Sequence, residues 1–162
     1  MIGCGGKNLP VDDRCEKAGS VAPEWVCGVG EPDALLWAVG HAAKAPRYGA
    51  QTLGARDAAY AALRSILRER ALFLLEPVFE AGPQNGALPE AIDSGVDSAV
   101  AQARTIDTWR HPGNGSLYLR VGIERKIVQS ALQEALKIDE VLWLQTQSAK
   151  AQETLYRALE AL

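Results

Sequence analysis

The sequence predicts an α+β fold, with a small three-stranded sheet that includes a β-hairpin, long helices packed on it, and a C-terminal helix. Apolar and polar residues alternate along 116–123, which is the period of a strand with one buried face. Apolar residues recur every three or four positions along 53–74, which is the period of an amphipathic helix. With 162 residues and 48% hydrophobic content, the chain has the size of one compact domain.

The N-terminal part predicts a tether followed by a strand. Residues 1–22 are rich in Gly, Pro, Asp and Lys and lack apolar periodicity, so we expect a flexible tether there. We expect the α+β domain over 23–138 and the C-terminal helix over 139–162. The apolar run at 24–29 lies between Pro and Gly residues and predicts the first strand, whose glycines leave one face open to close packing by a helix.

Helices are predicted in the middle of the chain. Residues 33–44 have helical spacing, and Pro46 ends this short helix because the residue before a proline avoids helical geometry. A long helix over about 49–77 follows, with many alanines that permit close approach to a sheet. Glycine, proline and asparagine predict a loop at 81–87, and a second helix is predicted over 89–103.

The clearest prediction is a hairpin. Residues 104–110 and 116–123 flank the turn sequence His-Pro-Gly-Asn-Gly at 111–115. Residues 124–137 carry apolar side chains on one helical face, and 138–162 predict a second, more polar helix. The expected order is strand, helix, helix, strand, strand, helix, helix.

The first seven residues, Met-Ile-Gly-Cys-Gly-Gly-Lys, look like the cut end of a bacterial lipoprotein signal peptide. An aliphatic and a small residue precede Cys4, which would carry the lipid. A full leader has a basic start and an apolar run of about 7 to 15 residues. Here only Met1 and Ile2 stand before the small residue, so either the leader was removed or the match is chance. Gly5 favours the outer membrane, because aspartate at that position is the usual inner-membrane retention signal.

The composition limits the classes of binding partner that we expect. The net charge is -3, the pI is near 5.4, and the sequence has no run of Lys and Arg. These properties argue against nucleic acid as a binding partner. No apolar run of the sequence approaches the roughly 20 residues that span a bilayer. We therefore expect membrane attachment through the covalent lipid or through a partner.

Three cysteines are an odd number, and lipidation of Cys4 would leave Cys15 and Cys27. These two either form a disulfide, whose short loop contributes at most about 3 kcal/mol, or remain reduced with Cys27 in the first strand. His41 and His111 lack metal-ligand spacing, and His111 is expected in an exposed turn. The sequence predicts no metal, cofactor, catalytic residue or small-molecule substrate. Trp143 and Leu144 form an apolar cluster on a polar helix, which predicts an intersubunit contact.

Three short motifs carry a family resemblance. They are Pro-Glu-Trp-Val at 23–26 before Gly-Val-Gly at 28–30, Ala-Arg-Asp-Ala-Ala at 55–59, and Thr-Trp-Arg at 108–110 leading into Leu-Tyr-Leu-Arg-Val at 117–121. Over about 22–137 the chain resembles the Lpp-twenty type of bacterial lipoprotein, and the flagellar lipoprotein FlgP is similar. The resemblance implies an outer-membrane lipoprotein with a small three-stranded sheet packed by helices and without a known catalytic activity, which tends to self-associate or to join an envelope assembly.

The chain departs from the family between Glu31 and Thr52, where members have a shorter connection. The extra residues predict either a contact surface of this chain alone or a tolerated surface insertion. The leading hypothesis is a non-enzymatic, Cys4-anchored envelope lipoprotein that forms homo-oligomers or binds envelope proteins at the periplasmic face of the outer membrane. The alternatives are a lipoprotein regulator of a cell-wall synthase and an enzyme with an unrecognised site.

Overall fold

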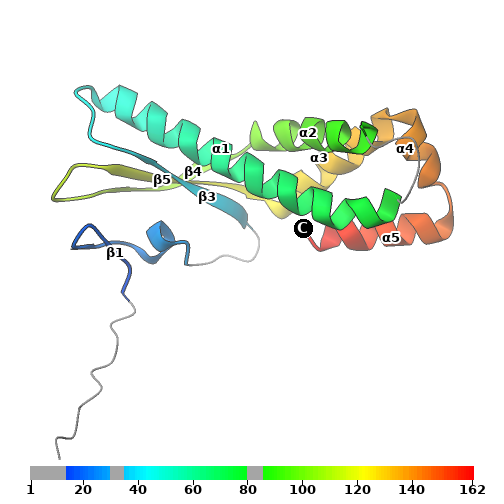
Figure 1. The fold of residues 1–162 in the computed structure, drawn as a ribbon, viewed down its shortest axis with the longest axis horizontal. Helices are drawn as coiled ribbons and strands as arrows, with labels where there is room; N and C mark the ends of the chain where they lie inside the picture. The colour runs from blue at the N-terminus through cyan, green and yellow to red at the C-terminus, as the bar shows by residue number, and fades with distance from the viewer. Residues whose placement is uncertain (1–13, 30–34, 80–85) are drawn as a thin grey trace, which may run out of the picture.

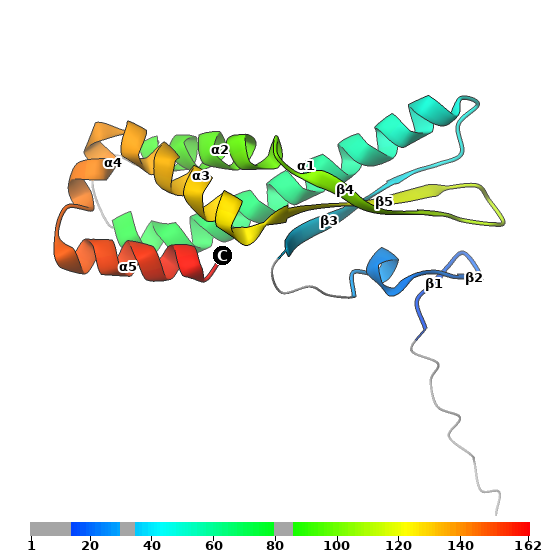
Figure 2. The same ribbon diagram turned by 180° about the vertical axis from the view of Figure 1, so that it is seen from behind.

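The computed structural model describes residues 14–29, 35–79 and 86–162, and it confirms the α+β class. The molecule is elongated, with a sheet in one half and helices in the other (Figure 1). The long helix α1, Tyr48–Leu75, runs through both halves and confirms the predicted long helix. A small N-terminal hairpin lies on the side of the sheet opposite to α1 (Figure 2).

The sheet has three antiparallel strands in the order β3-β5-β4. The central strand β5, Leu117–Glu124, pairs with β3, Leu35–Ala42, and with β4, Arg104–Arg110. The predicted hairpin is therefore confirmed, with an irregularity in β4 between Thr105 and Asp107. The alternation that predicts β5 also identifies its buried face: Leu117, Leu119, Val121 and Ile123 are buried.

The first strand of the sheet lies later in the chain than the sequence predicts. Residues 24–29, predicted as a strand, contain the 3-10 helix η1, Glu24–Cys27, which ends at Gly28 with a positive φ of 80°. Residues 33–44, predicted as a helix, contain β3. Both predictions are wrong. Residues 35–42 form a strand because pairing along the whole length of β5 outweighs a weak local helical pattern. Residues 24–27 form a turn of 3-10 helix between Pro23 and Gly28. The segment between Glu31 and Thr52 thus provides an edge strand of the sheet and is not a surface insertion.

Close packing of the helix on a glycine occurs at Gly40 of β3. A Cβ atom there would overlap the carbonyl oxygen of Ala55 and the backbone nitrogen of Ala59. Ala55 and Ala59 are fully buried, so small residues on both sides bring the backbones of α1 and β3 together. The alanines of α1 therefore permit the close approach that the sequence predicts, but the glycine is in β3 and not at 24–29.

The buried face of α1 rotates along the helix. An α-helix has about 3.6 residues per turn, so a stripe that repeats every four residues turns by about 40° at each step. Ala55 and Ala59 in the N-terminal half face β3 at Gly40, and the C-terminal half of α1 runs beside the other helices (Figure 1). The stripe has alanines where α1 approaches β3 and mostly leucines further along the helix. The stripe consists of Gln51, Ala55, Ala59, Leu63, Leu67, Ala71 and Leu75.

We call the other half of the molecule the helical end, and it consists of α2, α3, α4 and α5 with the C-terminal half of α1. Helix α2, Ala87–Val100, and helix α3, Arg125–Ile138, confirm two predicted helices. They pack closely at Gly95, where a Cβ atom would lie 3.0 Å from the Cα of Leu132. The long helix is followed by the 3-10 helix η2, Glu76–Phe79, and residues 81–85 of the predicted loop lie outside the described residues.

The C-terminal segment forms two helices where one is predicted. Helix α4, Glu140–Gln145, and helix α5, Ala149–Glu160, each begin with a capped turn. Asp139 accepts a hydrogen bond from the backbone of Leu142, and Ser148 accepts one from the backbone of Ala151. The segment packs back onto the domain and shares its core, through Leu142, Leu155, Leu159 and Leu162.

The predicted tether is partly wrong. Strands β1, Glu16–Lys17, and β2, Ser20–Val21, form a hairpin through the turn residues Ala18 and Gly19. Both turn residues have positive φ, of 45° and 78°, as a type I′ hairpin turn requires. Residues 14–22 therefore belong to a folded element, and residues 1–13 lie outside the described residues.

Candidate functional site

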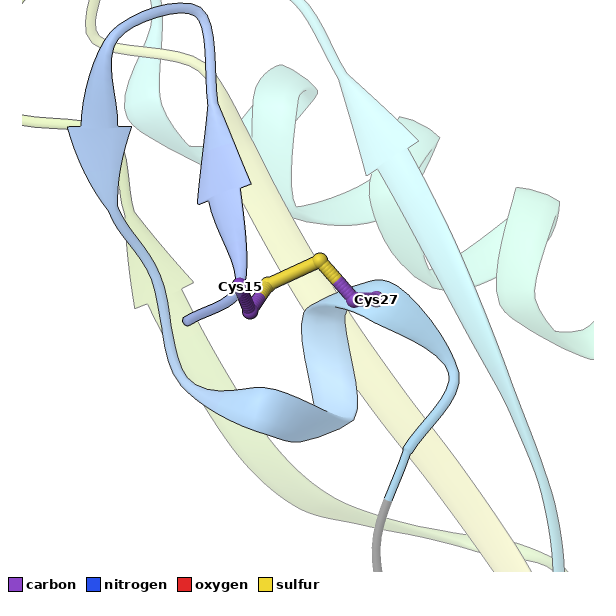
Figure 3. The surroundings of a disulfide bond; sticks show 2 residues. All are labelled: Cys15 and Cys27. Carbon is purple, nitrogen blue, oxygen red and sulfur yellow. A yellow bond between two sulfur atoms is a disulfide. The ribbon is translucent and has the colours of Figure 1, made fainter. Parts of the chain in front are cut away.

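The structure joins Cys15 and Cys27 by a disulfide (Figure 3). Their Cα atoms are 5.8 Å apart, and the backbone nitrogen of Ala22 donates to the carbonyl oxygen of Cys15. Of the two alternatives for these cysteines, the disulfide is the one the structure contains, and Cys27 lies in a 3-10 helix. The predicted lipidation site Cys4 lies outside the described residues.

The disulfide closes what we call the N-terminal lobe, residues 14–29. The lobe packs against Trp109 and Tyr118 on the sheet face that α1 leaves open. The guanidinium of Arg120 lies 5.6 Å from the ring centroid of Trp25 and 5.1 Å from that of Trp37, and it pairs with Asp107. These cation–π contacts link the lobe to two strands of the sheet.

Three segments that are far apart in the sequence meet at the tip of the sheet, and we call this surface the loop end: residues 17–20, 43–54 and 110–116. They are the β1–β2 turn, the loop before α1 with its first turns, and the β4–β5 turn. Figure 1 and Figure 2 show all three at the same extremity of the molecule. The side chain of Lys44 lies against Gly115, where a Cβ atom would be 3.0 Å from its Cδ.

His111 connects two of these turns and is 3% exposed. Its Nδ1 accepts hydrogen bonds from the backbone nitrogens of Gly113 and Asn114, at 3.0 Å each. The ring proton therefore belongs on Nε2, which donates to the carbonyl oxygen of Lys17 at 2.8 Å. The expectation of an exposed turn histidine is wrong, because the ring is enclosed by its own turn and by the N-terminal lobe.

Gln51 connects α1 to the same turn and is 2% exposed. Its Nε2 donates to the carbonyl oxygen of Gly115 at 2.8 Å, and its Oε1 accepts from Nη1 of Arg110 at 2.8 Å. Arg110 also lies over the ring of Tyr48, 5.0 Å from the centroid. Buried polar groups that are fully paired hold their neighbours in one arrangement. The loop end is therefore a set of loops with fixed relative positions.

The loop end is positively charged. Its three segments contain no Asp or Glu, and α1 begins without an acidic residue in its first turn. Arg47 occupies the N-cap position of α1, and its side chain makes no capping hydrogen bond there. Lys44 and Arg47 are exposed, as is the ring of Tyr48 at 70%. The cations of the loop end are Lys17, Lys44, Arg47 and Arg110.

The helical end presents apolar side chains instead. Leu144, predicted as part of an interface, is 64% exposed, and Ile138 is 83% exposed. Val141 is also exposed on α4. Trp143 is half-buried, with Nζ of Lys137 5.9 Å from its ring centroid. We call Ile138, Val141 and Leu144 the apolar cluster of the helical end, and the intersubunit contact at this place stays a prediction.

The grooves of the helical end are lined mainly by small and polar side chains. A groove of about 490 Å³ runs between α2 and α3. Within the described residues, no group of three or more His, Cys, Asp or Glu is arranged to hold a metal ion. The described helices likewise include none that is both long and apolar enough to cross a membrane. Residues along the groove include Ser94, Ser98, Ser130 and Ala131.

Sequence reasoning missed the loop end. Gln51 looks like a surface residue of a helix, and His111 like a turn residue, until the fold brings both against the β4–β5 turn. The signal that points to this surface is the run of residues 43–54, which has two cations and no acidic residue. No protein-family model matches this chain, and no curated protein matches its sequence.

Proposed function

We propose that this chain is a lipid-anchored interaction domain of the bacterial envelope, attached through Cys4 to the periplasmic face of the outer membrane. The Cys15–Cys27 disulfide carries the proposal, because disulfides persist in oxidising compartments such as the periplasm. It lies shortly after the lipoprotein-like motif around Cys4. The resemblance of residues 22–137 to Lpp-twenty type lipoproteins supports the same assignment.

The proposed role is assembly with other copies of the chain or with envelope proteins, and it rests on the apolar cluster of the helical end. Exposed apolar side chains are ordinary when they are scattered, but a contiguous group is typical of a contact surface. Ile138, Val141 and Leu144 lie within seven residues of chain and are all exposed. Burial of these three apolar side chains against a protein partner would remove them from water, which is favourable.

Metabolic labelling with palmitate tests the anchor. The gene with its natural upstream codons is expressed, and the envelope is fractionated. We expect labelled protein in the outer membrane and loss of label in Cys4→Ala. A Cys15→Ser/Cys27→Ser variant is the matched control, because it keeps Cys4 and should keep the label. Label that persists in Cys4→Ala, or upstream codons without a basic and apolar leader, would contradict the anchor.

Sedimentation of the purified chain tests the assembly role. Fully burying one leucine side chain contributes about 1.5 to 3 kcal/mol, so Leu144→Ser should weaken self-association or partner binding by about tenfold or more. Leu53→Ser is the control, because Leu53 is 50% exposed on α1, away from the cluster. Equal effects of the two variants would count against the helical end as the contact surface.

A further inference from the structure

We propose that the loop end is a docking surface for anionic phospholipid headgroups of the membrane to which the chain is anchored; this rests on the proposed function. The whole chain has a net charge of -3, yet the three segments of the loop end carry four cations and no Asp or Glu. Negative charge is therefore concentrated elsewhere, and the molecule has one end of opposite sign. An anionic surface attracts such an end first.

The path of the chain brings this end to the membrane. The ten peptide units from Cys4 to Arg14 span at most roughly 35 Å. Arg14 leads directly into β1, whose turn belongs to the loop end, and Figure 1 shows the described chain beginning beneath the sheet and far from α4. A tether of this length keeps the local lipid concentration high, so a weak interaction is enough to orient the domain.

The rigidity of the loop end favours docking. His111 and Gln51 fix the three loops by hydrogen bonds beneath the surface, so the cations are presented without further ordering of the backbone. Tyr48 is exposed beside them, and tyrosine is enriched where proteins meet the interface between lipid and water.

Arg47 is a poor residue for the stability of α1. Its backbone, with φ of -114° and ψ of 123°, has the extended geometry in which Asp, Asn or Ser caps a helix. A cation at this end of a helix also opposes the helix dipole. Departures from the locally most stable residue are typical of surfaces kept for a function. Arg47 is therefore the residue that separates binding from stability.

The experiment measures binding of the full 162-residue chain, unacylated through Cys4→Ala and with its disulfide formed, to sedimented vesicles. One set of vesicles contains phosphatidylcholine only, and the other contains 30% phosphatidylglycerol. Each Lys or Arg near such a surface contributes about a fivefold gain in partitioning. We expect binding to the phosphatidylglycerol vesicles only, and a steep loss when salt shortens the screening length.

Two variants of the loop end test whether its cations bind the vesicles. Arg47→Asp should weaken vesicle binding by about fivefold or more and raise the melting temperature, because aspartate caps α1. Lys44→Glu/Arg47→Asp should weaken binding by about 25-fold or more. Lys126→Glu/Lys150→Glu is the control, since it reverses two exposed cations of the helical end and should bind nearly as the parent chain does.

Several results would overturn the proposal. These are equal binding to both vesicle types, an equal loss in the control variant, or displacement from vesicles by millimolar inorganic phosphate, which would indicate a site for the free anion. Failure of the anchor would appear in palmitate labelling of Cys4 and would leave vesicle binding unchanged. Failure of the docking surface would appear only in the vesicle experiment, so the two proposals fail separately.

Discussion

The loop end and the helical end share α1, but different interactions hold them together. At the loop end, Gln51 and His111 are buried polar hubs that fix three loops by hydrogen bonds. At the helical end, side chains such as Leu132 and Val96 are fully buried in an apolar core. Hydrogen bonds specify positions, whereas apolar contacts mainly require volume. Buried hydrogen bonds therefore give the loop end a charged surface of fixed geometry. Apolar packing gives the helical end its stability.

The largest expected effect is at the contact between α1 and the sheet. Gly40→Ala should lower the free energy of unfolding by at least about 3 kcal/mol, because the new Cβ meets the backbone of Ala55 and Ala59 and neither can move as a flexible side chain does. Chemical denaturation measures the change. Gly54→Ala is the control across the same contact, and it should stabilise by about 0.5 to 1 kcal/mol, since its Cβ would meet only the Ala42 Cβ at 3.6 Å. Two destabilised variants would contradict this account.

Leu132→Ala tests the helical end. Leu132 of α3 is fully buried and lies against Gly95 of α2, so its truncation should cost about 3 kcal/mol. Because α1 crosses both ends, we expect a single transition by fluorescence and by circular dichroism. Two separated transitions would show that the halves unfold independently, as two domains do.

Gln51→Leu tests the loop end with a side chain of similar size. The carbonyl oxygen of Gly115 and the guanidinium of Arg110 lose a partner, so we expect a loss of about 2 kcal/mol. Hydrogen exchange should rise first in the β4–β5 turn. Thr52→Val is the control, because Thr52 only donates to the carbonyl oxygen of Tyr48 at an exposed site. An equal loss in both variants would rule out a special role for the buried amide.

The smallest effects compare two ion pairs. Asp107→Asn removes the negative charge that pairs with Arg120, whose side chain is 12% exposed and lies over two tryptophan rings, and should cost about 1 to 2 kcal/mol. Asp97→Asn breaks a pair with Arg64 in which both side chains are about half exposed, and should cost about 0.5 kcal/mol or less. Thermal denaturation at two salt concentrations measures both. A larger effect at Asp97 would reverse the expected ranking.

Regular periodicity made much of the fold predictable. Strand β5 has a strict alternation, and α3 has an uninterrupted apolar face, so local pattern and tertiary burial agree. The segment 33–44 failed because its apolar residues suit either a helix or a strand, and pairing with β5 decides between them. Segment 24–29 failed because Pro23 before it and Gly28 within it favour a turn of 3-10 helix closed by the disulfide.

The candidate surfaces were predictable only in part. The apolar cluster around Leu144 is visible in the sequence as the run Val-Leu-Trp-Leu at 141–144, which is a local property. The loop end depends on contacts over 64 and 94 positions of sequence, from Gln51 to Gly115 and from Lys17 to His111. The two partners of such a contact are too far apart in the sequence for a local pattern to predict that they meet. The charges of these segments were visible, but their meeting at one surface was not.

The length of α1 sets a distance between the two surfaces. Its 28 residues give a straight rod on the order of 40 Å long. With the loop end on the headgroups, as proposed, the rod would carry the apolar cluster to a height above the bilayer that is set by the length of α1. Insertion or deletion of whole helical turns in α1 would change that height.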